Sequence, residues 1–175
     1  MEVYQPAEDS HLLADVLKSY FGNLVDKDIS YLDMGCGSGI LSETALDFGI
    51  ENVLAVDINP DAVEEARRVG AIGVVSNLFN KVEGKFDVIS FNAPYLPLDD
   101  REPEDSQVAT TGGKRGDEVA VLFLKEAKKH LLEGGKIFLL ISSLTPISEI
   151  EKFGGFEVAK SRIFGEDLIV LQIDN

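Results

Sequence analysis

Short apolar runs alternate with helical patterns along almost the whole chain of 175 residues, and this alternation restricts the fold more than any other feature. The apolar runs have the length of buried strands, whereas the segments between them repeat apolar residues every three or four positions. Strand–helix–strand units of this kind build a mainly parallel sheet that helices cover on both faces. The predicted strands are residues 29–35, 52–58, 71–76, 86–92 and 136–142.

The predicted helices carry ordinary helix start and stop signals. Residues 8–22 place their apolar side chains on one stripe of a helix. A second helix follows Gly39, and a third begins with Asn59 as its N-cap and Pro60 at its first position. A fourth and longer helix is predicted over residues 117–132, before a glycine stops it.

The carboxyl-terminal part of the chain adds two strand patterns, residues 156–164 and 168–174, which are close enough to form a hairpin. We therefore expect a seven-stranded, mainly parallel sheet with an antiparallel strand near one end. No linker or repeat divides the chain, so we expect residues 1–175 to form a single domain. Residues 96–116 show no periodicity, which is typical of either a functional or an unstructured loop.

The composition disfavours several classes of protein. Acidic residues outnumber Lys and Arg by 31 to 16, whereas a phosphate-backbone binder needs the opposite charge. No stretch has the roughly 20 apolar residues of a membrane span, and the first residues do not resemble a signal peptide, so we expect a soluble, cytoplasmic protein. One cysteine, Cys36, and two separate histidines, His11 and His130, give no pattern of metal ligands, so no metal site is predicted.

A glycine-rich turn, LDMGCGSGIL, follows the first predicted strand. Gly35, Gly37 and Gly39 allow a tight turn that brings backbone N–H groups close to a ligand at the start of the next helix. A dinucleotide fingerprint needs a further glycine where this chain has Ile40, which disfavours a dehydrogenase. Asp33 precedes the glycines and places a carboxylate where the amino group of an amino acid could be held. S-adenosylmethionine has such an end.

The next two strands end in further candidates for binding a nucleoside. Asp57 ends the second strand with Ile58 beside it, and a carboxylate there can accept hydrogen bonds from both ribose hydroxyls. Asn77 and Leu78 follow the third strand, where the amide can pair with an adenine edge and the leucine can cover the adenine face. Each feature is weak alone, because Asp57 could cap a helix and Asn77 could form an ordinary turn. At the ends of three successive strands, however, they predict one cofactor crevice.

The fourth predicted strand ends in the sequence NAPY. The side-chain carbonyl of Asn92 and the main-chain carbonyl of Ala93 can accept the two hydrogens of a substrate NH2 group. Pro94 favours an extended Ala93, and Tyr95 offers a flat face. Holding both hydrogens out of the plane weakens delocalisation of the nitrogen lone pair and aims it at an electrophilic methyl group. The motif therefore predicts N-methylation, and the alternative is that it merely terminates the strand.

The glycine motif, Asp57 and NAPY together resemble the class I S-adenosylmethionine-dependent methyltransferases that carry an [N/D]-P-P-[Y/F/W] motif. VYQPAEDSHLL at residues 3–13 and GGKRGDEV at 112–119 resemble the HemK-like release factor glutamine methyltransferases. The short amino-terminal region favours the eukaryotic and archaeal branch of that family. The resemblance implies a Rossmann-like fold, S-adenosylmethionine as cofactor, and the Gly-Gly-Gln glutamine of a class 1 peptide chain release factor as substrate. It also implies that Ser10 joins the cofactor residues and that Asn92 holds the glutamine amide.

Two residues depart from the pattern of this family. Ala93 stands in place of the first proline of the motif, so the carbonyl acceptor is kept while one fixed φ angle is lost. Asn77 occupies a position where many relatives have Asp, so contact with adenine requires an altered geometry.

The resemblance further implies a heterodimer with a small zinc-binding methyltransferase activator. Residues 71–76 are apolar and thinly charged, as an edge strand that pairs with another chain would be, although the protein's own loops could cover that edge.

Two other functions stay open, namely adenine-N6 methylation of DNA or RNA and a noncatalytic cofactor-binding subunit. The first needs a flipped base on Tyr95 and a basic channel, whereas the only adjacent cationic pair near the proposed site is Lys114 and Arg115, which the acidic residues 99–105 oppose.

Overall fold

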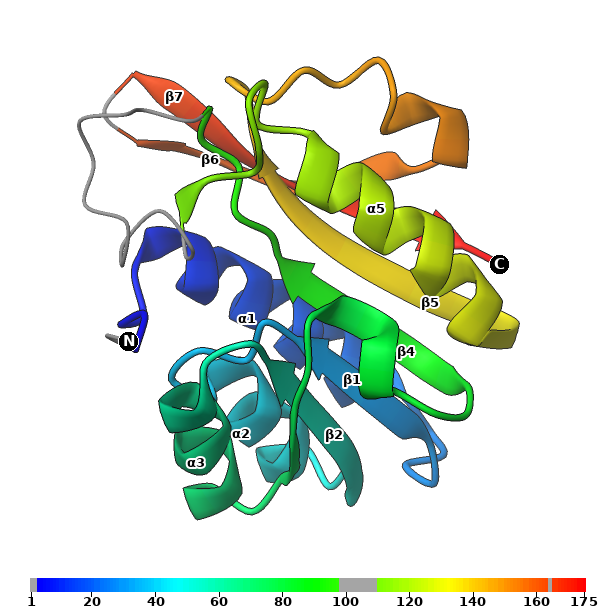
Figure 1. Ribbon diagram of the computed structural model, residues 1–175. Helices are drawn as coiled ribbons and strands as arrows, with labels where there is room; N and C mark the ends of the chain where they lie inside the picture. Colours follow the sequence, from blue (N-terminus) through cyan, green and yellow to red (C-terminus); the bar gives the residue numbers. More distant parts are fainter. Residues whose placement is uncertain (1–2, 98–109, 164) are drawn as a thin grey trace.

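A computed structural model describes residues 3–97, 110–163 and 165–175, which form a twisted sheet with helices on both faces (Figure 1). Within these ranges the sheet has seven strands in the order β3-β2-β1-β4-β5-β7-β6. The strands are β1 (Ser30–Met34), β2 (Asn52–Asp57), β3 (Ile72–Val75), β4 (Phe86–Asn92), β5 (Leu131–Ser142), β6 (Phe156–Ile163) and β7 (Glu166–Asp174). The helices are α1 (Glu8–Asn23), α2 (Ile40–Asp47), α3 (Pro60–Arg68) and α5 (Glu118–Ala127), with 3-10 turns η1 (Leu78–Lys81), η2 (Lys128–His130) and η3 (Glu151–Phe153).

The strand directions confirm the predicted mixed sheet. Strands β1 to β5 pair in parallel with one another, whereas β7 runs antiparallel to both β5 and β6. The hairpin places β7 between β5 and β6, and β3 lies at the opposite edge. The carboxyl ends of β1, β2, β3 and β4 therefore meet along one side of the sheet.

Two hydrophobic cores lie on opposite faces of the sheet, as Figure 1 shows by the positions of α1 and α5. Ile89 and Phe91 of β4 pack in the cluster that contains Phe123 of α5, whereas Val88 packs in the cluster that contains Leu13 of α1. Successive side chains of a strand point to opposite faces, so a buried parallel strand must be apolar on both. This explains why the predicted strands have continuous apolar runs and not alternating ones.

The prediction of one long helix over residues 117–132 was wrong. Helix α5 ends at Ala127, η2 follows it, and β5 begins at Leu131, five residues before the predicted strand. Leu131 is buried and pairs with Phe86 of β4. Pairing with the neighbouring strand has overridden the helical propensity of the leucines, which is only a weak preference.

Most of the predicted loop at residues 96–116 lies outside the described residues, which resume at residue 110. The part that follows leads directly into α5. None of the helices in the described ranges is both long and apolar enough to cross a membrane.

Candidate active site

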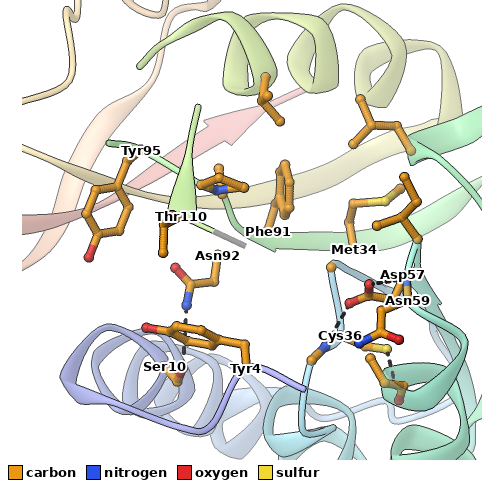
Figure 2. A pocket seen from close by; sticks show the side chains of 18 of the residues that line it. Tyr4, Ser10, Met34, Cys36, Asp57, Asn59, Phe91, Asn92, Tyr95 and Thr110 are labelled. Atoms are coloured by element: carbon orange, nitrogen blue, oxygen red, sulfur yellow. Dashed lines mark hydrogen bonds between the residues drawn. The ribbon is translucent and has the colours of Figure 1, made fainter. Parts of the chain in front are cut away.

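A cavity of about 410 Å³ opens where the carboxyl ends of β1, β2, β3 and β4 meet (Figure 2). This volume lies within the range of roughly 300–1,000 Å³ that is typical of small-molecule sites. The structure brings most of the predicted site residues together on the cavity wall. They are Ser10, Gly35, Gly37, Asp57, Ile58, Asn77, Leu78, Asn92, Ala93, Pro94 and Tyr95.

Two of the predicted glycines have different surroundings. Gly35 lines the cavity with φ +64°, and a Cβ there would lie 2.8 Å from the ring of Phe91. Gly39 does not line the cavity but is the N-cap of α2 with φ +84°. A Cβ on Gly39 would lie 3.2 Å from the Cα of Ala66, so this glycine allows α2 to pack closely against α3.

Asp33 lies behind the cavity wall and not on it. Its side chain is fully buried, and Ser42 donates a hydrogen bond of 2.6 Å to Oδ2. Oδ1 has no hydrogen-bond partner within the described part of the chain. Burial raises the pKa of Asp33 to about 7, because desolvation disfavours the charged carboxylate. A buried carboxyl oxygen without a hydrogen-bond partner is suited to interact with a cationic group nearby.

Asp57 connects the end of β2 to the glycine turn. The backbone N–H of Gly37 donates to Oδ2 at 3.0 Å, and the backbone N–H of Asn59 donates to Oδ1 at 2.8 Å. Each carboxylate oxygen keeps a further lone pair for a ligand hydroxyl. The side chain therefore has a fixed position in the cavity before any ligand arrives.

Leu78 occupies an unusual backbone conformation at the adjacent wall. Its φ is +45°, and Leu78 is the only non-glycine residue of the described ranges with a positive φ. Ser76 holds this turn, since its hydroxyl donates to the carbonyl of Leu78 at 3.0 Å and accepts from the N–H of Lys81 at 3.0 Å. Backbone strain of this kind concentrates at ligand sites. The sequence contains no signal for this strain.

Asn92 ends β4 with its side chain in the cavity. Its Nδ2 donates to Oγ of Ser10 at 3.4 Å, while its Oδ1 is buried without a partner among the described residues. Ser10 in turn donates to Oδ1 of Asp9 at 3.3 Å, and the Tyr4 hydroxyl donates to Oδ2 of Asp9 at 2.8 Å. Because Ser10 uses its proton on Asp9, its lone pairs face Asn92. This leaves the Asn92 carbonyl oxygen as a free acceptor.

Tyr4 and Asp9 are site residues that the sequence reasoning missed. Both lie in the segment 3–13, which carried the family resemblance, so the signal was present in the sequence without an assigned role. Tyr4 lines the cavity together with Tyr95. Burial raises the pKa of both tyrosines, so both stay neutral at physiological pH and serve as walls and hydrogen-bond donors, not as bases.

Comparison with known proteins defines the class of the chain. The sequence profile of the methyltransferase small domain family matches residues 8–164, so the chain belongs to that family. The 16S rRNA N2 G1207 methyltransferase of T. thermophilus, solved with AdoMet and guanosine, has a TM-score of 0.71 at 22% identity and covers 98% of this chain and 44% of its own. The ribosomal protein L11 methylase of Lactobacillus delbrueckii has a TM-score of 0.67 at 20% identity, covering 99% and 82%. These structures confirm the predicted Rossmann-like methyltransferase fold.

Curated relatives narrow the class. A Methanocaldococcus jannaschii protein, provisionally named a protein N5-glutamine methyltransferase, is 42% identical over 97% of this chain and 90% of its own length. Methyltransferase HEMK2 of Homo sapiens is 30% identical over 96% and 87% of the two chains. The chain is thus a member of the protein N5-glutamine methyltransferases and an S-adenosylmethionine-dependent N-methyltransferase.

The residues of the cavity fit S-adenosylmethionine. The glycine turn brings backbone close to a ligand, and Asp57 has fixed oxygen acceptors that ribose hydroxyls could use. Behind the wall, Oδ1 of Asp33 has no partner among the described residues and suits the positive charge of the cofactor. The cofactor supplies an electrophilic methyl group on a sulfonium. The task left to the protein is therefore to bind, orient and exclude water.

Proposed function

We propose that this protein methylates the side-chain amide N5 of the glutamine in the Gly-Gly-Gln motif of a class 1 peptide chain release factor. The observation that carries the proposal is Oδ1 of Asn92, which is buried and has no partner among the described residues, while Ser10 accepts the hydrogen bond from Nδ2. Names of relatives support the substrate. The Aquifex aeolicus relative is named a release factor glutamine methyltransferase, and the Schizosaccharomyces pombe relative is named an eRF1 methyltransferase catalytic subunit.

In this proposal the glutamine amide lies between the two tyrosines of the cavity. Oδ1 of Asn92 accepts one amide hydrogen, and the main-chain carbonyl of Ala93 accepts the other. An amide nitrogen is a poor nucleophile because its lone pair is delocalised, and two acceptors outside the amide plane weaken that delocalisation. As the N–C bond forms, the bond between the methyl carbon and the sulfonium sulfur would break and leave a neutral thioether. One amide proton would then pass to water, so no strong base is needed before transfer.

For the cofactor, we propose contacts from three strand ends. Gly35 and Gly37 approach the amino-acid part, Asp57 binds the ribose hydroxyls with Ile58 beside it, and the residues after β3 bind adenine. The supports are the position of these residues on one cavity wall and the two backbone hydrogen bonds that fix Asp57. We also assign to the cofactor site Ser10, Asn77, Leu78 and Asn92, which line the cavity, and Asp33 and Gly39, which do not line it but flank the glycine turn.

The proposal is tested by labelling. Methyl-labelled S-adenosylmethionine is incubated with the protein and either a release factor or an adenine-containing nucleic acid, each with and without a small zinc-binding activator. We expect label on the release factor, at the Gly-Gly-Gln glutamine, and none on a matched release factor in which that glutamine is replaced by alanine. Label on adenine would establish the rival function, and no transfer under any condition would indicate a noncatalytic subunit.

The Ser10→Ala variant tests how the substrate amide is held. We expect kcat to fall about tenfold, because Asn92 loses the acceptor that fixes its orientation. Ser10→Thr keeps the hydroxyl and should keep most of the rate. Steady-state methylation with calorimetric cofactor binding separates the two roles of Ser10. Loss of cofactor affinity with unchanged kcat would show that Ser10 serves the cofactor alone.

Cofactor affinity should depend on pH through Asp33. Below its pKa of about 7 the free protein carries a proton on this carboxyl group, and a cationic ligand favours its loss. The dissociation constant should therefore rise as pH falls from about 7 to 5.5, by at most about tenfold per pH unit. Calorimetry over this range checks the slope. Asp33→Asn should bind more weakly with a flat pH profile, and an equal slope in that variant would exclude Asp33 as the cause.

We also propose a partner at the β3 edge, a small zinc-binding activator, because Ile72 of this edge strand is 60% exposed and an unpaired strand can pair with another chain. The name of the S. pombe relative, a catalytic subunit, is consistent with a second subunit.

We further propose that residues 1–175 act as one methyltransferase domain, since both hydrophobic cores share one sheet, and that the protein works in the cytoplasm with its substrate.

A further inference from the structure

Residues 110–116 lie against the chain segment that leaves Asn92. The backbone N–H of Leu96 donates to the carbonyl of Thr110 at 2.9 Å, and the carbonyl of Leu96 accepts from the N–H of Gly112 at 2.9 Å. Leu96 and Thr111 form a parallel bridge outside the main sheet. Residues 110–112 are therefore hydrogen-bonded to both the N–H and the carbonyl of Leu96, which lies four positions after Asn92.

Gly112 and Gly116 allow residues 110–116 to approach the backbone of Pro94 and Tyr95 more closely than a residue with a side chain could. A Cβ on Gly112 would lie 2.5 Å from the carbonyl oxygen of Pro94 and 2.2 Å from that of Gly116. Gly116 has φ +98°, and a Cβ there would lie 2.7 Å from the carbonyl oxygen of Tyr95. Cβ contacts this short do not occur without displacement of the backbone. The glycines thus form the surface on which the carbonyls of Pro94 and Tyr95 rest.

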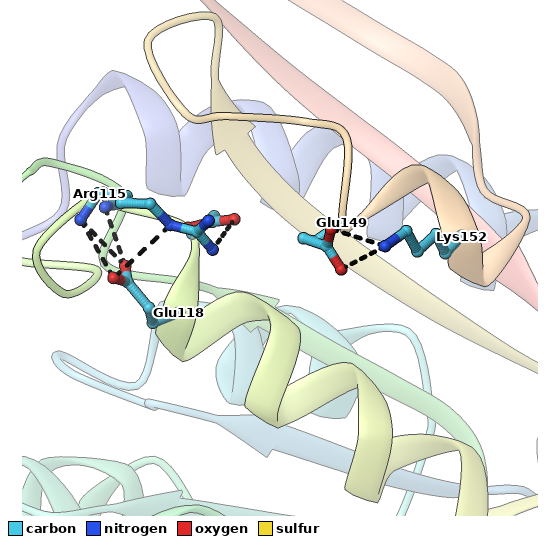
Figure 3. A network of polar contacts seen from close by, with 6 residues as sticks. Arg115, Glu118, Glu149 and Lys152 are labelled. Carbon is cyan, nitrogen blue, oxygen red and sulfur yellow. Dashed lines mark hydrogen bonds and ion pairs between the residues drawn. The ribbon is translucent and has the colours of Figure 1, made fainter.

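Polar contacts of Arg115 and Glu118 (Figure 3), together with one backbone hydrogen bond, hold the two glycines in turn. The carboxylate of Glu118 accepts from the backbone N–H of Arg115 at 3.1 Å and from that of Gly116 at 3.2 Å. The guanidinium of Arg115 donates at 3.0 Å to Asp117, whose side chain is fully buried. The carbonyl of Gly112 accepts from Val119 at 3.1 Å, which ties the turn to the first residues of α5.

We propose that residues Gly112 to Glu118 are a brace that positions Asn92 and Ala93 for methyl transfer. The proposal rests on the proposed function. One of the two acceptors there is a main-chain carbonyl, so its direction depends on the backbone of the following residues. Ala93 has no ring to fix its φ, and within residues 92–96 only Pro94 has such a ring. The brace supplies the missing rigidity from outside the motif, and none of its residues needs to touch the substrate.

The matched pair Gly116→Ala and Gly84→Ala tests the brace. Both sites have positive φ, +98° and +86°, but a Cβ on Gly84 meets nothing within 4 Å. Both substitutions should lower the melting temperature because of the positive φ, and Gly116→Ala should lower it further because its Cβ also meets the carbonyl oxygen of Tyr95. Only Gly116→Ala should lower kcat, by about 30-fold or more, because it displaces the backbone at Tyr95. Its cofactor dissociation constant should stay within about threefold of the wild type.

If Gly116→Ala does not fold, a second pair of variants, which changes side chains and not the backbone, tests the same proposal. Arg115→Gln removes the ion pair with Asp117, and Lys152→Gln removes the exposed pair with Glu149 that Figure 3 also shows. We expect kcat to fall about threefold or more in Arg115→Gln, to recover in Arg115→Lys, and to remain unchanged in Lys152→Gln.

The outcomes separate the brace from the proposed function. If the wild type methylates the release factor and Gly116→Ala or, where it does not fold, Arg115→Gln keeps the full kcat, the brace is wrong and the function stands. If Gly84→Ala loses kcat as much as Gly116→Ala, the effect is one of stability and the brace is again wrong. A wild type that does not methylate the glutamine overturns the function itself, and the brace falls with it.

Discussion

Asn92→Ala is expected to lower kcat by about a thousandfold or more while changing the cofactor dissociation constant by less than about tenfold. The substitution removes Oδ1, which has no partner among the described residues and is the side-chain acceptor of the proposed amide-binding site. The carbonyl of Ala93 remains, but one acceptor cannot hold both amide hydrogens out of the plane. Single-turnover methylation with saturating cofactor measures the chemical step, and calorimetry measures cofactor binding.

Two further variants make this result specific. Asn92→Asp keeps an oxygen acceptor, now as part of a carboxylate, and should retain more activity than Asn92→Ala does. Asn80→Ala removes an exposed asparagine of η1 that does not line the cavity and should behave as the wild type. If cofactor affinity and turnover of Asn92→Ala fell together by a large factor, Asn92 would serve the cofactor, and its assignment to the glutamine amide would be incorrect.

Asp57→Ala should have the opposite signature, a loss of cofactor affinity by about a hundredfold with kcat at saturation within about threefold of the wild type. Each hydrogen bond to a charged group contributes about 1.5–3 kcal/mol, so losing the two proposed ribose contacts costs about 3–6 kcal/mol, and a hundredfold loss is near the lower end of that range. The substitution also releases the backbone N–H groups of Gly37 and Asn59, which loosens the glycine turn. Cofactor titration by calorimetry and steady-state kinetics measure the two quantities.

The control for Asp57 must lose a carboxylate without touching the cavity. Asp47 at the end of α2 is exposed and is not part of the cavity wall, so Asp47→Ala should bind cofactor as the wild type does. Melting temperatures of both variants exclude a general loss of structure. Equal cofactor affinity in Asp57→Ala and Asp47→Ala would place the ribose elsewhere in the cavity.

The candidate site was largely predictable because its residues stand at strand ends. In a parallel sheet the carboxyl ends of neighbouring strands meet at one edge, so Gly35, Asp57 and Asn92 had to lie near one another once their strands were recognised. Two results were not predictable from this rule. Asp33 lies behind the wall, and Tyr4 reaches the cavity from the segment before α1, where neither periodicity nor a strand end indicates a position.

The sequence by itself determined the alternation of strands and helices, the edge of the sheet at which ligands bind, and the residue types that reach it, because these depend on local periodicity and on chain direction. Only the tertiary structure decided the position of β7 between β5 and β6, the early start of β5 at Leu131, and that Nδ2 of Asn92 has a partner whereas its Oδ1 has none among the described residues. Strand order and side-chain orientation depend on contacts between residues far apart in the chain, such as Asn92 with Ser10, and no local pattern encodes such contacts.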